Sequence, residues 1–142
     1  MRKAVAVLAA AAAALVVAPS TANAAEYGCT GSLIDTYKVK SNWNHLSTIR
    51  LYYNASTGYN CAVNVRVHPY NQFKHDTSIT LMNEDWREDN HRPGYNIDED
   101  GGKFQYYAGP VKVYGKGKCI SMRAVTYYYT ERALRDVWGV HC

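Results

Sequence analysis

The sequence predicts a small all-β domain, an antiparallel sandwich or barrel of about six to seven strands. Short stretches that alternate apolar and polar residues are separated by turn residues throughout much of the chain. The chain also contains 13 Tyr, 3 Trp and 2 Phe, and aromatic residues favour strands over helices. Four cysteines in a chain of 142 residues indicate two disulfides.

The first 24 residues are predicted to be a secretory signal peptide. Arg2 and Lys3 precede the apolar run 4–18, and an Ala-x-Ala cleavage site occupies 22–24. Residues 25–142 then form a single secreted domain of 118 residues, with 14 basic and 12 acidic side chains and a net charge of +2. This length excludes a large multidomain protein, and no other apolar run reaches the ~18 residues of a membrane span.

All four cysteines lie in the exported part, where disulfides form: Cys29, Cys61, Cys119 and Cys142. They allow three connectivities. We favour Cys29–Cys61 and Cys119–Cys142, which close loops of 32 and 23 residues. No Cys-x-x-Cys pair is present, so neither a zinc knuckle nor a thioredoxin-type site is expected.

The clearest strands flank a turn in the first half of the chain. Residues 48–53 alternate, with Ile49, Leu51 and Tyr53 on one face. Residues 61–67 alternate as well, and the pattern predicts the following orientations: Cys61, Val63, Val65 and Val67 inward, Asn64 and Arg66 outward. Because 54–58 has turn chemistry, the two strands are expected to form a hairpin.

Later segments show the same succession of strands and turns. The predicted elements are a strand at 104–107, a turn at 108–110, a strand at 111–114, a turn at 115–117 and a strand at 118–124. Strands are also predicted at 32–39 and 78–82. Residues 130–138 fit either a short C-terminal helical turn or a last strand that leads to Cys142.

The segment from Asn83 to Gly94 is polar, nearly aperiodic and broken by Pro93. It predicts a long exposed loop, and such loops are either functional or mobile. A small disulfide-bonded scaffold can hold such a loop rigid and so reduce the entropy lost on binding. A secreted inhibitor of a hydrolase is therefore an alternative function.

Residue types used by small ribonucleases occur around this loop. They include His75, Asp76, His91, Arg87, Arg92 and the acids Glu84, Asp85, Glu88 and Asp89. A polar loop holds such types by chance, so we expect solvated charge and name no catalytic residue. A secreted ribonuclease or other hydrolase stays a lesser alternative.

An acidic stretch near the middle of the chain resembles half of a calcium-binding loop. Asn96, Asp98 and Asp100 alternate and are followed by Gly101, but Tyr107 stands where the bidentate Glu is required. An acidic turn is the preferred interpretation, and no metal is expected. The chain lacks a P-loop, a dinucleotide fingerprint and a basic stripe, so neither a cofactor nor nucleic acid is expected as a ligand.

Two blocks resemble the spore-associated protein A family of streptomycetes. The first runs from Thr48 to Val67 and includes Asn54, Gly58 and Cys61; the second joins 100–111 to 117–120. Members of that family are small exported proteins with cysteines in similar places. The resemblance implies a secreted actinobacterial protein attached to spores or aerial filaments, and it implies no catalytic residue.

Pairs and triplets of tyrosine supply the remaining candidate site. Consecutive strand residues face opposite sides, so one member of each run is expected to point outward, namely Tyr52, Tyr107 and Tyr128. Outward aromatic rings form platforms for sugar rings or proteins. The sequence thus predicts a non-enzymatic surface-associated protein that binds wall or coat polymers, or copies of itself, through an aromatic face.

Overall fold

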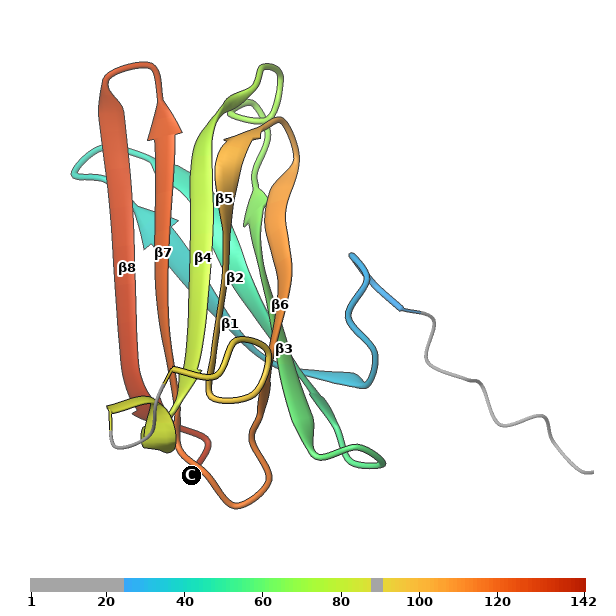
Figure 1. Cartoon of the computed structure of the whole chain (residues 1–142). Helices are drawn as coiled ribbons and strands as arrows, with labels where there is room; N and C mark the ends of the chain where they lie inside the picture. Colours follow the sequence, from blue (N-terminus) through green and yellow to red (C-terminus); the bar gives the residue numbers. More distant parts are fainter. Residues whose placement is uncertain (1–24, 88–90) are drawn as a thin grey trace, which may run out of the picture.

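Two antiparallel four-stranded sheets face each other in the computed structural model, which describes residues 25–87 and 91–142 (Figure 1). The first sheet has the order β1-β2-β3-β6 and the second β5-β4-β7-β8. The elements are β1 (Ser32–Lys40), β2 (His45–Asn54), β3 (Tyr59–Arg66), β4 (His75–Asn83), the 3₁₀ helix η1 (Glu84–Arg87), β5 (Ile97–Phe104), β6 (Tyr107–Tyr114), β7 (Ile120–Tyr128) and β8 (Glu131–Val140).

The predicted all-β class and both favoured disulfides, Cys29–Cys61 and Cys119–Cys142, are confirmed. The described residues form eight strands instead of six to seven. Residues 131–140 form β8 and not a helical turn. The predicted signal peptide, 1–24, lies outside the described residues.

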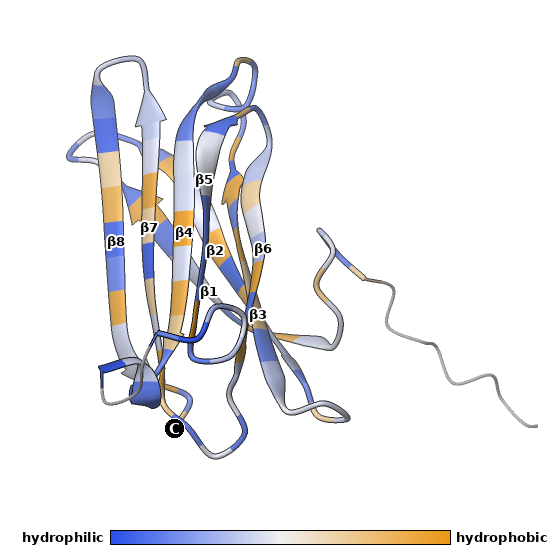
Figure 2. Ribbon diagram, in the orientation of Figure 1, coloured by the Kyte–Doolittle hydropathy of each residue, from blue (hydrophilic) through white to orange (hydrophobic). Residues whose placement is uncertain are grey.

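The main core lies between the sheets, and buried apolar residues alternate with more exposed ones most regularly along β4, β6 and β7. Figure 2 shows bands of hydrophobic and hydrophilic residues along β7 and β8. Ile49 and Leu51 of β2 contact the same core as Ile79 and Leu81 of β4, and all four are fully buried. Complete burial of each such side chain contributes about 1.5–3 kcal/mol, so the two faces hold the sandwich together.

Strand β3 has the opposite orientation to the predicted one. Ala62 lies in the main core, and Asn64 and Arg66 are 0% and 2% exposed on that same face. Cys61 and Val63 instead face away from the second sheet, into a small separate core. The apolar face was expected inward because only one side of the sheet was expected to be covered.

Residues 25–31 cover the outer face of the first sheet, which the sequence pattern did not predict to be covered. The disulfide to Cys61 holds Cys29 over the outer face of the first sheet, where both cysteines pack against Tyr52 and Val63. A strand buried on both sides carries apolar residues on either face, so alternation alone does not identify the main core.

The turn before β6 also differs from the prediction. The chain reverses at 105–106, and Gly109 lies inside β6. Gly109 has φ +104°, and a Cβ there would lie 2.9 Å from the carbonyl oxygen of Ala62. The pairing register shifts at this point, between Ala62 and Asn64. Gly109 therefore allows a β-bulge inside a strand, whereas the sequence predicted a tight turn at this position.

Candidate functional site

Strands alternate in direction along the chain, so every second connection lies at the same end of the sandwich (Figure 1). Four connections share this end: 41–44, 67–74, 105–106 and 129–130. Each contributes a strongly exposed ring: Trp43, Phe73, Tyr106 and Tyr129 are 80%, 56%, 59% and 65% exposed. We call this surface, together with Tyr70 and Tyr128, the aromatic end.

The rings next to β7 and β8 support one another through edge-on contacts. The Tyr128 centroid lies 5.0 Å from that of Tyr70 and 4.8 Å from that of Tyr129. His75 completes the cluster, at 5.2 Å from Tyr128 and 4.7 Å from Tyr129. Burial, and secondarily the charge of Arg66, lowers the pKa of His75, which favours a neutral imidazole among the rings.

A buried guanidinium supports this cluster from inside the sandwich. Arg66 donates from Nη1 to Thr77 Oγ1 at 2.8 Å and to the carbonyl of Tyr127 at 3.0 Å, and from Nε to the carbonyl of Tyr70 at 3.0 Å. Burial lowers the pKa of Arg66. Arg66 therefore joins the 67–74 connection to strands β4 and β7, which hold the rings above it.

A second contact joins the two sheets at the same end. Asn44 Nδ2 donates to both carboxylate oxygens of Glu131 at 3.1 Å, and Ser41 Oγ donates to the same carboxylate. The backbone N–H of Trp43 donates to Ser41 Oγ at 3.1 Å. The turn that carries Trp43 is thus tied to the start of β8, beside Tyr129.

A hollow of about 420 Å³ lies beside the 67–74 and 105–106 connections of the aromatic end. Its lining consists of Lys74, Lys103, Phe104, Gln105, Tyr106 and Tyr107. Gln105 Nε2 donates to the carbonyl of Gln72 at 3.3 Å, which links the 105–106 turn to the 67–74 connection. The Tyr107 ring rests edge-on against Tyr27 at 5.2 Å.

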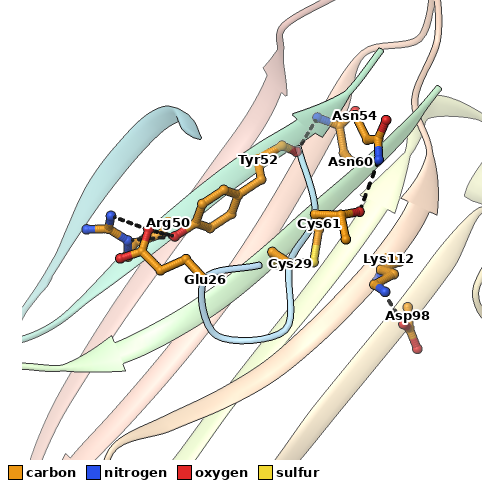
Figure 3. Close-up of a disulfide and its surroundings, with 10 residues drawn as sticks. Glu26, Cys29, Arg50, Tyr52, Asn54, Asn60, Cys61, Asp98 and Lys112 are labelled. Carbon is orange, nitrogen blue, oxygen red and sulfur yellow. Dashed lines mark hydrogen bonds and ion pairs between the residues drawn. A yellow bond between two sulfur atoms is a disulfide. The ribbon is translucent and has the colours of Figure 1, made fainter. Parts of the chain in front are cut away.

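The three tyrosines that were predicted at the surface differ in their exposure. Tyr128 belongs to the aromatic end and Tyr107 lines the adjoining hollow, and both are half-buried. Tyr52 was wrongly expected on the surface, because it is only 2% exposed beneath residues 25–31. Its hydroxyl donates to Glu26 Oε2 at 2.7 Å and accepts from Arg50 Nε at 2.9 Å (Figure 3).

Sequence reasoning missed Trp43 and Phe73 as candidate binding residues. Both lie in connections, where the alternation used to predict strand faces gives no information. The signal that could have found them is a large aromatic residue among turn-forming polar ones, such as Trp43 between Asn42 and Asn44.

The residue types considered for a ribonuclease are not brought together. His75 and Asp76 lie at the aromatic end, whereas the other described members follow β4 at the opposite end, namely Glu84, Asp85, Arg87, His91 and Arg92. Arg87 lies 5.1 Å from the Trp86 ring centroid, and His91 lies 5.9 Å from it. Glu88 and Asp89 fall outside the described residues. The described part of the set forms no shared site.

Asp98, Asp100 and Gly101 lie in β5, so the acidic turn predicted for this stretch is wrong. Asp98 Oδ2 accepts the backbone N–H of Lys112 at 2.8 Å (Figure 3), and Asp100 Oδ2 accepts that of Gly109 at 2.7 Å. Both carboxylates thus pair with edge strand β6 of the other sheet. Within 25–87 and 91–142, no cluster of three or more His, Cys, Asp or Glu residues has the arrangement of a metal site.

A separate polar cluster joins β1 to the C-terminal residues at the opposite end. Asp35 Oδ2 accepts the Tyr37 hydroxyl at 2.7 Å and lies 3.1 Å from His141 Nε2. The hydrogen bond from Tyr37, with that of His141, lowers the pKa of Asp35, whereas burial and Asp35 raise the pKa of Tyr37 to about 12. This cluster tethers the two sheets.

The Asp35 tether is expected to weaken in acid. A lowered folded-state pKa means that the carboxylate stabilises the fold above its unfolded pKa of about 3.9, and that this contribution disappears as the pH falls further. Since Asp35 is 40% exposed, solvent screening limits the effect to about 0.5 kcal/mol. Urea unfolding of Asp35→Asn between pH 6 and 2.5 should show a smaller acid loss than the parent, while the exposed control Glu99→Gln should not.

Comparison with protein-family models, curated proteins and solved structures finds no match to this chain. In the described residues, no helix is long and apolar enough to cross a membrane. The site must therefore be interpreted from its own geometry.

Proposed function

We propose that this protein is an exported, non-enzymatic surface protein that binds wall or coat polymers through the aromatic end. The observation that carries the proposal is the convergence of four exposed rings, on four separate connections, at one end of the sandwich. Exposed aromatic side chains cost free energy in water, and their flat faces complement the C–H faces of sugar rings. The site is therefore the connecting loops, not a sheet face.

Rigidity of these loops supports the same function. The Glu131 contacts with Ser41 and Asn44 and the Arg66 contacts with Tyr70 hold the rings before any ligand arrives. A preformed surface loses less conformational entropy on binding than a flexible one. Export agrees with two disulfides, which persist in oxidising compartments. Attachment to spores or aerial filaments follows from the family resemblance and forms part of the proposal.

A depletion assay tests the proposal directly. Oxidised protein is mixed with intact spores, peptidoglycan or chitin, and the fraction left in the supernatant is measured. We expect saturable binding that falls at least about fivefold in Trp43→Ser/Tyr106→Ser, since loss of stacking on each ring costs about 0.5–1.5 kcal/mol.

Trp138→Ser is the matched control, because Trp138 is 50% exposed on β8 but lies near the opposite end. It should bind as the parent does. Equal binding by all three proteins would exclude the aromatic end as the site. Complete recovery from every polymer would exclude adhesion and would direct attention to the inhibitor function of the 83–94 segment.

A further inference from the structure

The aromatic end carries an excess of positive charge. Within two residues of its four connections the chain has five Lys or Arg residues but two acidic ones. The basic residues are Lys40, Arg66, Lys74, Lys103 and Arg132, and the acidic ones are Asp76 and Glu131. Counted in the same way, the three connections at the opposite end, 55–58, 84–96 and 115–119, have four Lys or Arg residues and five acidic ones. The two ends of the sandwich thus differ in charge.

With both acids counted, an excess of three positive charges remains at this end. Glu131 accepts hydrogen bonds from the neutral donors Ser41 and Asn44, and Asp76 lies opposite Lys103 in the β4–β5 ladder. Asp76 can offset one lysine of the hollow, but Lys74 stands outside that pairing. No ion pair of Lys74 or Lys103 occurs among the described residues.

Nearby positive charges also contribute to the lowered pKa values of two histidines at this end, His45 and His75. After burial, Lys38 and Lys40 contribute to lowering the pKa of His45. Arg66 and Lys103 do the same for His75, against an opposing effect of Asp76. Burial is the main cause of both lowered pKa values, and the positive side chains that add to it would also attract an anion to this surface.

The hollow places charge and rings within reach of a single ligand. Lys74 and Lys103 share its lining with Phe104, Tyr106 and Tyr107. A sugar ring can stack on an aromatic face while an acidic substituent contacts an ammonium group. A neutral polymer would use the rings and leave both lysines without a role.

We infer that the polymer bound at the aromatic end is an anionic glycopolymer, whose sugar or polyol units carry phosphate or carboxylate groups. This inference rests on the proposed function and specifies its ligand. A glycopolymer fits better than nucleic acid, because residues 25–142 carry a net charge of only +2 and no basic stripe, whereas nucleic-acid binding draws on many cationic contacts.

Binding should be measured by isothermal titration at 50 and 300 mM NaCl with four probes: poly(glycerol phosphate) teichoic acid, polygalacturonate, soluble chitooligosaccharide and single-stranded oligothymidylate. The variant is Lys74→Gln/Lys103→Gln. Its matched control is Lys112→Gln/Lys116→Gln, which changes the net charge equally at exposed residues remote from the hollow.

We expect at least one of the two anionic glycopolymers to bind more tightly than the neutral chitooligosaccharide, and the higher salt concentration to weaken that binding. Two screened surface contacts correspond to a loss of about fivefold in the hollow variant, against less than about twofold in the control. The teichoic acid and polygalacturonate results distinguish phosphate from carboxylate as the recognised group.

Four other results would each overturn one or both proposals. Tight, salt-independent binding of the neutral probe that the lysine variant retains would overturn the anionic ligand and leave the proposed function standing. Tighter binding of oligothymidylate than of either glycopolymer would overturn the ligand class. If no probe binds and the depletion assay also fails, both proposals are overturned. Equal losses of affinity in the two lysine variants would show that net charge alone causes the effect, and this would overturn the role of the hollow.

Discussion

Replacing Arg66 with methionine is expected to lower the free energy of unfolding by about 3–5 kcal/mol. Arg66 is only 2% exposed, and the hydrogen bonds of its guanidinium reach Thr77 and the carbonyls of Tyr70 and Tyr127. Methionine fills much of the volume but donates nothing, so these acceptors would stay buried without partners. Each loss of this kind costs about 1–3 kcal/mol.

Urea unfolding followed by circular dichroism measures this loss, and Arg123→Met serves as the control. Arg123 is an arginine on the outer face of the second sheet, 53% exposed, with a 2.7 Å ion pair to Asp136. Its replacement should cost less than about 1 kcal/mol. If the two variants lose similar stability, Arg66 does not anchor the aromatic end. Arg66→Lys should fall between them, because lysine keeps a charge but loses the planar fork.

Removing the Cys29–Cys61 disulfide as Cys29→Ala/Cys61→Ala is expected to cost about 3–4 kcal/mol in the chain-entropy model for its 32-residue loop. The same change should release residues 25–31 from the outer face of the first sheet. Tyr52 and Val63 would then lose their cover, and the hydrogen bond from Tyr52 to Glu26 would open.

Cys119→Ala/Cys142→Ala provides a matched comparison, since its loop of 23 residues gives a similar entropic cost. Hydrogen exchange should distinguish the two variants. We expect faster exchange along the outer face around Tyr52 in the first variant and unchanged exchange there in the second. Protection around Tyr52 that survives loss of the Cys29–Cys61 bond would show that residues 25–31 hold their place without it.

Local patterns in the sequence were sufficient for much of the architecture. Ile49 and Leu51 share a buried face as predicted, and Ile120 and Met122 share one in the strand predicted at 118–124, because a side-chain period of two is a property of a strand by itself. The turn at 54–58 also follows from residues adjacent in the chain. These features need no knowledge of distant segments.

The errors all involve a distant partner. Asn64 and Arg66 face the core because Ser78, Thr126, Thr77 and Tyr127 supply their hydrogen-bond partners there. Asp98 and Asp100 lie in a strand because the backbone of β6 needs acceptors at that edge. The identity of a polar residue does not reveal whether the fold will provide it with hydrogen-bond partners.

By itself, the sequence indicated the all-β class, two disulfides and a high content of tyrosine, and among three possible connectivities it favoured the pairing that the structure has. Only the tertiary structure decided that Tyr52 is buried while Trp43, Phe73, Tyr106 and Tyr129 gather at one end. The physical reason is that alternation reports which residues share a face within one strand. Exposure depends on which segments cover that face, and a binding surface depends on which connections the two sheets bring together.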